Sequence, residues 1–417
     1  MKIVDLYTLF TKHGLVDTDT RKIRKNTIFF ALKGGNFNGN KFAEEALEKG
    51  AILSIIDEVE FDTSEKTILV ENVLKTLQEL ASYHRNALNI PIISLTGSNG
   101  KTTTKELINA VLSTKYITTA TVGNLNNHIG VPLTLLSMTA DTQIGIVEMG
   151  ANHSNEIAFL SKLSNPDFGY ITNFGSAHLE GFGSVEGVVK AKSELYDYLI
   201  DNNKKIFVNP QDSIQLEKTK NANIILFEES IEFVQADPFV KLSYRTIDIQ
   251  SNLIGAYNFS NISAAITIAN YFKVSKEEIR EAIEKYIPSN NRSQIIETKK
   301  NKIILDAYNA NPTSMKAAID SFSTLKSAHK VIIIGDMFEL GDYSLKEHQK
   351  IVDLAIEYKF DNLFFVGENF NRTETDYQKF ISFEALKKHL INNPIQKSVI
   401  LIKGSRGMAL ERVVELC

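Results

Sequence analysis

The chain has almost none of the features that mark a secreted or membrane-spanning protein. Its 417 residues include one cysteine, Cys417, so neither an intrachain disulfide nor a cysteine metal cluster can form. No run of about 18 apolar residues is present to span a bilayer. The first residues also lack the basic segment, apolar run and small-residue site of a secretory signal. We therefore expect a cytoplasmic protein without a membrane span.

Surplus positive charge is absent as well. The 46 Lys and Arg residues are outnumbered by 50 Asp and Glu residues, which gives a formal net charge of −4. This balance argues against a broad basic surface for nucleic acid or for a membrane. It still allows a local cationic site for a phosphorylated ligand, so we expect small-molecule partners and no nucleic acid.

The order of apolar patterns predicts an α/β protein with three domains. Short apolar runs and a helical pattern at 73–87 fill the first part of the chain. From Pro91 onward, strand-like and helix-like patterns alternate, which favours a parallel sheet covered on both faces. A polar stretch at 288–291 interrupts this alternation, which then restarts. The boundaries are therefore predicted at 1–87, 88–291 and 292–417, with a hinge at 286–293.

The predicted elements give each domain its type. The central domain has strands at 92–95, 143–148, 168–172, 205–208 and 223–227, helices at 102–112, 185–200 and 260–271, and a meander at 239–253. The C-terminal domain has strands at 302–305, 330–334, 362–366 and 398–402 and helices at 314–325, 345–358, 382–390 and 408–416. The central pattern suits a P-loop ATPase-like parallel sheet, and the C-terminal pattern suits a Rossmann-like unit.

A glycine-rich run between a predicted strand and a predicted helix predicts a phosphate-binding loop. Its residues are Gly97, Ser98, Asn99, Gly100, Lys101, Thr102 and Thr103. Glycines let backbone N–H groups turn toward phosphate oxygens, and the helix N-terminus adds free donors. Lys101 is expected to reach the β- and γ-phosphates of ATP, and the Thr102 hydroxyl to bind Mg²⁺. Two residues separate the glycines instead of four, which indicates a subgroup of the motif; the alternative is a chance Gly-Lys-Thr turn.

Three further side chains are candidates for the same site. Glu148 ends a predicted strand, where ligands of parallel sheets collect and where a carboxylate can hold a hard cation. His178 lies in the loop after the next strand, and Lys192 lies in an amphipathic helix. Each has an ordinary alternative: a solvated strand-end acid, a solvated or capping histidine, and a solvated helix lysine.

Taken together, these motifs resemble the Mur ligases, which build the peptide of bacterial cell-wall precursors. The matching runs are TGSNGKT at 96–102, GNLNNHIGVP at 123–132, VEMG at 147–150, NFGSAHLE at 173–180, GAYN at 255–258, DAYNANPTSM at 306–315, GDMFELG at 335–341 and KGSR at 403–406. At the N-terminus, DTR at 19–21 and FALKG at 30–34 resemble the family's segment for the UDP part of the substrate. Tyr257 departs from the histidine that is usual in the family.

The resemblance implies an ATP-dependent amide ligase. It would add D-alanyl-D-alanine to UDP-N-acetylmuramoyl-tripeptide through an acyl phosphate, act as a monomer and use two Mg²⁺ ions. Thr102, Glu148, His178 and a carbamate formed from CO₂ on Lys192 would hold the metal, and Lys101 would act with them in catalysis. Besides the phosphate loop, the implied ATP contacts are Asn258, Arg292 and Asp306.

The implied substrate contacts come from all three domains. They are Thr20, Arg21, Lys33 and Gly34 in the N-terminal domain, Asn124, Asn126 and Asn127 in the central domain, and Asn309, Asn311, Lys403, Ser405 and Arg406 in the C-terminal domain. The last three would contact D-alanyl-D-alanine or the phosphates, or else form a surface turn. Arg292 and Asp306 have the alternatives of a solvated linker arginine and a strand-end aspartate.

Two other functions compete with this interpretation. A folate polyglutamylating ligase of the same group would have no UDP-binding N-terminal domain. An ATP-driven switch or assembly protein would turn over ATP without a second substrate. Phosphate release that depends on both UDP-muramoyl tripeptide and D-alanyl-D-alanine separates these possibilities.

Overall fold

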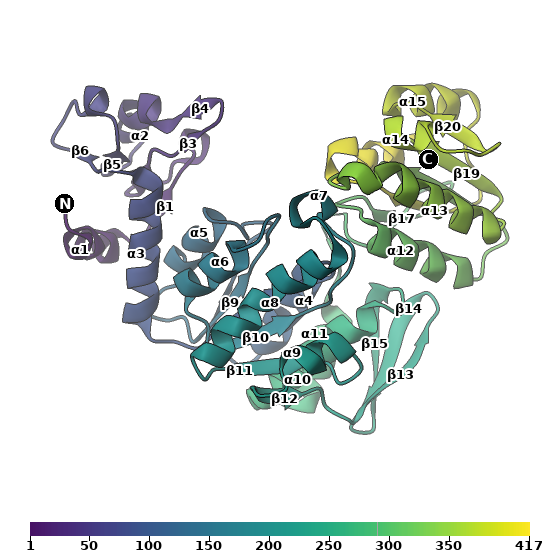
Figure 1. Cartoon of the computed structure of the whole chain (residues 1–417), viewed down its shortest axis with the longest axis horizontal. Helices are drawn as coiled ribbons and strands as arrows, with labels where there is room; N and C mark the ends of the chain where they lie inside the picture. Colours follow the sequence, from purple (N-terminus) through teal and green to yellow (C-terminus); the bar gives the residue numbers. More distant parts are fainter. Residues whose placement is uncertain (290) are drawn as a thin grey trace.

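The computed structural model describes residues 1–289 and 291–417, which form three α/β units in a row along the chain (Figure 1). The N-terminal unit has a parallel four-stranded sheet in the order β1-β2-β5-β6. Its elements are β1 (Val16–Asp17), β2 (Ile28–Phe30), β5 (Leu53–Ile56), β6 (Thr67–Leu69), the small ladder β3 (Lys33–Gly34) and β4 (Phe37–Asn38), and helices α1 (Ile3–His13), α2 (Ala43–Glu48) and α3 (Val73–Leu88). Helix α3 also packs on the central unit, so it joins the two.

The central unit contains a parallel six-stranded sheet in the order β12-β11-β10-β7-β9-β8. Its strands are β7 (Ile92–Thr96), β8 (Thr118–Ala120), β9 (Ile144–Glu148), β10 (Phe168–Ile171), β11 (Lys205–Val208) and β12 (Asn223–Leu226). Its helices are α4 (Lys101–Leu112), α5 (Gly130–Leu136), α6 (Glu156–Ser164), α7 (Leu179–Phe182), α8 (Val185–Asp201), α9 (Ser213–Lys218), α10 (Asn258–Tyr271) and α11 (Lys276–Lys285). An antiparallel meander, β13 (Ile231–Ala236), β14 (Phe239–Tyr244) and β15 (Ile247–Ile254), packs at its edge.

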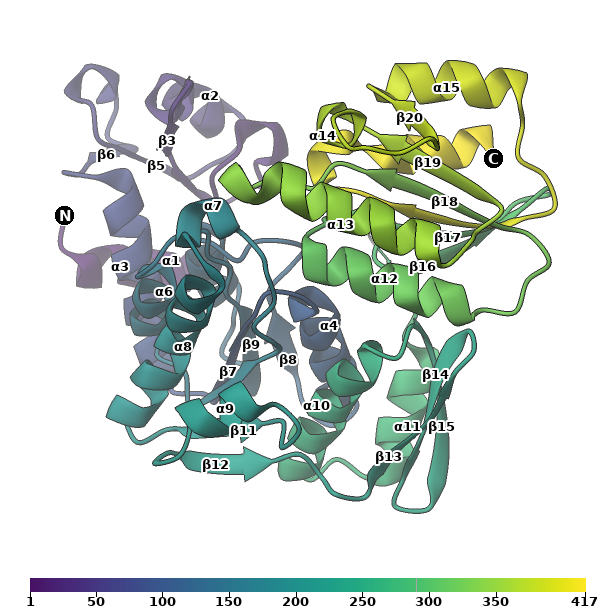
Figure 2. The same cartoon turned by 45° about the vertical axis from the view of Figure 1, so that its right-hand side comes forward.

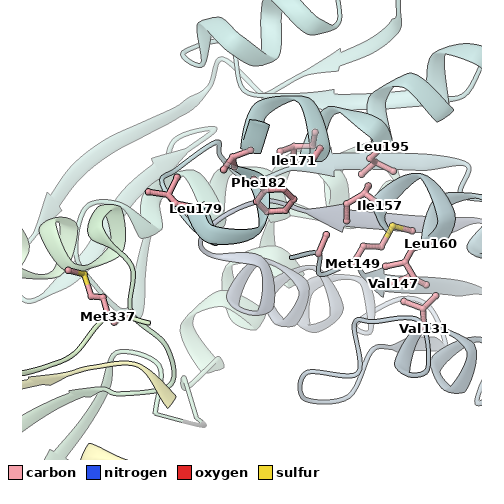
Figure 3. Packing of buried hydrophobic residues seen from close by; sticks show 14 of the residues in the cluster. Val131, Val147, Met149, Ile157, Leu160, Ile171, Leu179, Phe182, Leu195 and Met337 are labelled. Atoms are coloured by element: carbon pink, nitrogen blue, oxygen red, sulfur yellow. The ribbon is translucent and has the colours of Figure 1, made fainter. Parts of the chain in front are cut away.

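Apolar residues of the central strands alternate between two cores. Ile92 of β7 belongs to the core under α5, α6 and α8, whereas Ile93 and Leu95 belong to the core under α4 and α10. Figure 3 shows the first core, where Leu160 of α6 and Leu195 of α8 pack with strand residues. Because both faces are covered, these strands are continuous apolar runs, as the sequence predicts.

The C-terminal unit contains a six-stranded sheet in the order β16-β17-β21-β18-β19-β20, in which only β16 is antiparallel to its neighbour. Its strands are β16 (Gln294–Glu297), β17 (Lys302–Asp306), β18 (Lys330–Gly335), β19 (Asn362–Val366), β20 (Gln378–Phe380) and β21 (Val399–Lys403). Its helices are α12 (Pro312–Thr324), α13 (Ser344–Glu357), α14 (Glu368–Asn371) and α15 (Phe383–Asn392). Helix α12 lies on the side of this unit that faces the central unit (Figure 2).

One predicted helix has a different form. The segment predicted as a helix at 408–416 consists of two 3₁₀ helices, Arg406–Met408 and Leu410–Leu416. Ala409 between them has φ 47°, in the left-handed region, and a residue there ends a right-handed helical run. The interruption lets Leu410 and Val413 enter the core of the C-terminal sheet.

The topology brings the carboxyl ends of strands from two units to one cleft. Residues after β7, β9 and β10 and residues at the ends of β17 and β21 line the same cavity. Ligands of open parallel sheets collect at such ends. Among the residues that the structure describes, no helix is both long and apolar enough to cross a membrane.

Candidate active site

A cavity of about 880 Å³ lies between the central and C-terminal units. The central unit contributes the phosphate loop, Glu148, His178 and the asparagines at 124, 126, 127 and 258, and the C-terminal unit contributes Arg292, Asp306, Asn309, Asn311 and Lys403. The structure therefore brings together in one cavity most of the residues that the sequence singles out. The N-terminal residues, Lys192, Ser405 and Arg406 do not line it.

The phosphate loop has the backbone form that its glycines predict. Gly97 and Gly100 have φ of 143° and 78°, and Gly100 is the residue before the first turn of α4. A Cβ on Gly97 would lie 2.0 Å from the Thr172 hydroxyl, so only glycine fits there. The loop packs against the strand-end segment after β10, because the Asn99 N–H donates to Asn173 Oδ1 at 3.1 Å. This geometry places N–H groups at a helix N-terminus, where phosphate binds.

Lys101 is the charged group of this loop. Its Nζ donates to the Gly97 carbonyl at 2.7 Å and to the Ser98 carbonyl at 3.3 Å. Burial lowers the pKa of Lys101 below its usual range, while the nearby Glu148 carboxylate opposes that shift. An ammonium in such a poorly hydrated place binds a phosphate oxygen more strongly than a surface lysine does.

Glu148 has the geometry of a cation ligand. It is 1% exposed at the end of β9, and its Oε1 accepts hydrogen bonds from Thr102 Oγ1 at 3.1 Å and Asn126 Nδ2 at 2.8 Å. Its Oε2 is buried and has no hydrogen-bond partner among the described residues. An unpaired buried carboxylate oxygen beside a threonine hydroxyl suits a hard divalent cation. Protein carboxylates and imidazoles do not form a three-ligand cluster within the described part of the chain.

Lys192 lies just behind the cavity wall. It is fully buried on α8, its Nζ donates to the Ala151 carbonyl at 3.2 Å, and it lies 5.1 Å above the centre of the Phe182 ring. Burial lowers the pKa of Lys192 to about 7, and the positive charge of Lys101 adds to the effect. A lysine with this pKa is largely neutral above neutral pH, which is the nucleophilic form of an amine. The ordinary alternative of a solvated helix lysine is wrong, since the side chain has no exposed surface.

His178 faces the C-terminal unit. Its backbone has φ 54°, and its Nδ1 lies 2.5 Å from Oε2 of Glu339, in the loop after β18. The backbone N–H of Glu180 also donates to the Glu339 carbonyl at 3.2 Å. The histidine thus lines the cavity with a partner from another unit, and the sequence pattern gives no sign of that partner.

The C-terminal wall is held by a buried ion pair. Lys403 is 2% exposed, and its Nζ lies 2.6 Å from Asp306 Oδ2. The other oxygen of Asp306 accepts the Ser293 N–H at 3.1 Å, and the Arg292 guanidinium lies 3.7 Å from the centre of the Tyr308 ring. These contacts join the ends of β17 and β21 to the segment that follows the linker. The Arg292 guanidinium is stacked on an aromatic ring instead of solvated.

Asn311 connects this wall to the phosphate loop. Its Nδ2 donates to Asn99 Oδ1 at 2.7 Å, while its Oδ1 accepts the Ser314 N–H at the start of α12. The Ser176 N–H donates to Thr313 Oγ1 at 2.9 Å beside it. The start of α12 is therefore bonded directly to the central unit.

The remaining predicted substrate residues fall into two groups. In the C-terminal unit, Ser405 is buried, and its hydroxyl accepts the Phe338 N–H at 2.9 Å, while Arg406 pairs with Glu411 at 3.1 Å. In the N-terminal unit, the predicted contacts lie at the surface away from the cavity, in the 3₁₀ helix Thr20–Lys22 and in strand β3: Thr20, Arg21, Lys33 and Gly34. The Arg21 guanidinium there lies 2.8 Å from Asp19.

Sequence reasoning missed Asn261, which also lines the cavity. It lies on α10 one turn after Asn258, and its Nδ2 donates to Asn258 Oδ1 at 2.8 Å. Its Oδ1 accepts the Thr104 hydroxyl at 3.0 Å, so α10 is bonded to the phosphate-loop helix. The three-residue spacing of two buried asparagines on an apolar helix is the signal that could have found it.

The fold and the site are those of a nucleotide-dependent enzyme, with a phosphate-loop unit, a Rossmann-like unit and a cavity between them. The sequence matches the Mur ligase middle domain over residues 95–269 and the glutamate ligase domain of the Mur ligases over residues 291–406. It is 35% identical to a UDP-N-acetylmuramoyl-tripeptide–D-alanyl-D-alanine ligase of Bacillus subtilis, over 97% of this chain and 92% of that protein.

Solved structures agree with the sequence match. A MurF structure from Acinetobacter baumannii is similar with a TM-score of 0.86 and 31% identity, over 96% of this chain and 92% of the other. A MurF ligase from Thermotoga maritima, solved in complex with ADP, has a TM-score of 0.84 and 25% identity, over 98% and 97% of the chains. The chain belongs to the Mur ligase family.

Proposed function

We propose that this chain is an ATP-dependent amide ligase that joins D-alanyl-D-alanine to UDP-N-acetylmuramoyl-tripeptide in the synthesis of peptidoglycan precursors. The observation that carries the proposal is the shared cavity, in which a phosphate loop with Lys101 faces Arg292, Asp306 and Lys403 of the C-terminal unit. The near-full-length similarity to ligases named for this reaction supports it.

The reaction needs an activated carboxylate, because a carboxylate itself is a poor electrophile. In the proposed reaction, the terminal carboxylate of the tripeptide attacks the γ-phosphorus of ATP, and ADP leaves. The amine of D-alanyl-D-alanine then attacks the acyl phosphate carbon, and phosphate leaves with formation of the amide. Lys101 and the N–H groups at the start of α4 stabilise the negative charge on the transferring phosphoryl group.

A divalent cation is proposed beside the nucleotide. Thr102 Oγ1, the free Oε2 of Glu148 and the imidazole of His178 supply the protein ligands, and Mg²⁺ with phosphate oxygens suits such oxygen-rich sites. When bound, the ion would neutralise charge between ATP and the tripeptide carboxylate. Asn126 keeps the carboxylate of Glu148 oriented through its hydrogen bond.

Lys192 is proposed to be carbamylated by CO₂ and to hold a second Mg²⁺. The proposal is supported by the burial and the lowered pKa of its amine, since CO₂ reacts with a neutral amine and not with an ammonium. A buried ammonium near Lys101 would repel a metal ion, whereas a carbamate carries negative charge and two oxygen ligands. The buried amine lies beside the cavity wall, at the Ala151 carbonyl.

The N-terminal unit is proposed to hold the UDP part of the substrate. Arg21 and Lys33 are exposed cations whose carboxylate partners lie on the same unit, Asp19 for the first and Asp57 for the second. A diphosphate can replace Asp19 as the partner of Arg21, because an ion pair exposed at both ends is only weakly stabilising. Lys33 is 44% exposed and can turn toward the same group, although its partner Asp57 is buried. A substrate held here would extend its peptide toward the cavity of the central unit.

One assay tests the function. The purified chain is incubated with ATP, Mg²⁺, UDP-muramoyl tripeptide and D-alanyl-D-alanine, and phosphate release and the pentapeptide product are measured. We expect release that requires both acceptor substrates. Equal release with either one omitted would favour an ATP-driven switch, and activity with a folate substrate alone would favour a folate ligase.

A further inference from the structure

The loop between β18 and α13, residues 336–343, takes no part in the proposed reaction. It contains most of the GDMFELG run and reaches across to the central unit. Its Glu339 carboxylate lies beside an imidazole of that unit, with Oε2 2.5 Å from Nδ1 of His178. This pair joins the C-terminal unit to a proposed cation ligand of the central unit.

The loop is built to hold Glu339 in one place. The Met337 N–H donates to Nε2 of the buried His348 at 3.0 Å, and the Phe338 N–H donates to the Ser405 hydroxyl at 2.9 Å. On the other side of Glu339, Leu340 is buried in the core. Glu339 itself has φ 61°, in the left-handed region that costs a non-glycine residue free energy. Backbone strain of this kind persists only where the surroundings fix it.

The partner across the boundary is fixed in the same way. His178 also has a left-handed φ of 54°, and the Glu180 N–H donates to the Glu339 carbonyl. Figure 3 shows Leu179, next to His178, on the side of α7 toward Met337 of the C-terminal unit. Two strained residues therefore meet side chain to side chain, with a backbone hydrogen bond beside them.

The contact determines what the imidazole can do. A carboxylate beside Nδ1 favours the tautomer that carries its proton on Nδ1, which leaves the Nε2 lone pair free for a metal ion. In this structure the two atoms are close, but their angles fall short of a hydrogen bond. Without the carboxylate, the ring can rotate and can carry its proton on either nitrogen. Carboxylates in this position raise the metal affinity of a histidine ligand.

We propose that Glu339 is a positioning residue that orients His178, so that docking of the C-terminal unit completes the cation site of the central unit. This inference rests on the proposed function for the identity of the cation site. In this proposal, the GDMFELG run forms the loop that carries Glu339, and His348 and Ser405 support that loop through hydrogen bonds. It also reassigns Ser405 from a substrate contact to a support of that loop.

The first test measures metal binding without turnover. Mn²⁺ binding to the full chain with a non-hydrolysable ATP analogue is followed by electron paramagnetic resonance for wild type, Glu339→Ala, Glu339→Gln and Glu374→Ala. We expect Glu339→Ala to weaken Mn²⁺ binding about tenfold or more. Glu339→Gln retains an acceptor oxygen, so its Mn²⁺ affinity should lie between those of the wild type and Glu339→Ala. Glu374 is an exposed loop glutamate of the same unit and should bind as wild type does.

The second test asks whether Glu339 acts through His178. Glu339→Ala is combined with His178→Asn, and ¹⁵N-histidine spectra report the His178 tautomer in the wild type and in Glu339→Ala. We expect an Nδ1–H tautomer that is lost in Glu339→Ala, and no added loss of Mn²⁺ affinity in the double variant. Unchanged Mn²⁺ binding, an unchanged tautomer or additive losses would overturn the proposal. A wild-type chain that binds Mn²⁺ but makes no amide would instead refute the proposed function.

Discussion

The charged groups of the central unit and those of the N-terminal unit are held in different ways. Around the phosphate loop, Glu148 and Lys192 have almost no exposed surface: Glu148 accepts a hydrogen bond from Asn126, and Lys192 donates one to the Ala151 carbonyl. In the N-terminal unit, Arg21 has an 85% exposed side chain and Lys33 a 44% exposed one. Their ion pairs form with carboxylates of the same small unit.

This difference suits two roles: catalysis in the central unit and substrate binding in the N-terminal unit. Charges fixed in a poorly hydrated site act strongly on a transition state, because no solvent has to reorganise around them. Exposed charges bind a phosphorylated group through contacts that are the same in the ground state and in the transition state. Substitutions in the central unit should therefore lower kcat, whereas those in the N-terminal unit should raise KM.

The largest effect is expected for Lys101→Met. The substitution keeps much of the side-chain volume but removes the charge that meets the γ-phosphate, so kcat should fall about 10²- to 10³-fold. Phosphate release with both acceptor substrates measures it. Lys162→Ala, on the exposed surface of α6, is the control and should retain full activity. If the Lys101→Met enzyme retains more than a tenth of the normal kcat, the charges held in the central unit are not the ones that carry catalysis.

Lys192→Ala should lower kcat about 100-fold, and acetate should partly restore it by supplying a carboxylate in place of the carbamate. Lys190→Ala is the matched control, because Lys190 lies on the same helix but is exposed. An active Lys192→Ala enzyme, or one that acetate leaves unchanged, would remove the carbamate from the mechanism.

The lowered pKa of Lys192 gives the carbamate a distinct pH dependence. Since the pKa of Lys192 is lowered to about 7, the neutral fraction of its amine should rise from about one tenth at pH 6 to about nine tenths at pH 8. An ordinary lysine stays protonated over this range. Carbon-13 spectra with labelled bicarbonate should show a carbamate signal that grows as the pH rises through 7 and is missing in Lys192→Ala.

Much of the fold could be predicted because its strands are continuous apolar runs. Strand β11 has the predicted bounds, Lys205–Val208, and Phe207 and Val208 are fully buried. Among the strands that were missed, β8, β13, β16 and β20 lie at sheet edges and contain no fully buried residue, so their patterns do not differ from those of loops. The break at Ala409 was missed because no glycine or asparagine marks the left-handed residue there.

Local patterns alone predicted the site where its residues follow a strand, whereas Asn258 and Asn311 were predicted through the family motifs. Glu148 and Lys101 are set by local sequence, because Glu148 ends β9 and Lys101 opens α4 directly after the glycine loop that follows β7 in the same sheet. The hydrogen bond between Asn99 and Asn311 joins residues 212 positions apart. It depends on how two units dock, and no periodicity within either unit encodes that.

Substitution of Asn311 tests this contact, with a smaller expected effect. Asn311→Ala removes both the cap of α12 and the bond to Asn99, whereas Asn311→Ser retains a capping oxygen and removes only the bond. Loss of one hydrogen bond between the units, about 1 kcal/mol, should lower kcat/KM about fivefold in both variants. Only Asn311→Ala should also lower the melting temperature. If Asn311→Ser has normal kcat/KM, the contact between the units is not used during catalysis.

The smallest effect is expected for substitution of Arg21, which tests whether the exposed charges of the N-terminal unit act only in substrate binding. Its guanidinium can exchange Asp19 for a phosphate of the substrate, because both ends of that ion pair are exposed. Arg21→Ala should raise KM for the UDP-linked substrate about three- to tenfold with kcat unchanged, since the lost contact is made equally in the ground state and in the transition state. Lys22→Ala, an exposed neighbour, serves as the control. A fall in kcat for Arg21→Ala would mean that the N-terminal unit also positions the reacting carboxylate, so that recognition and chemistry are not divided between the two units.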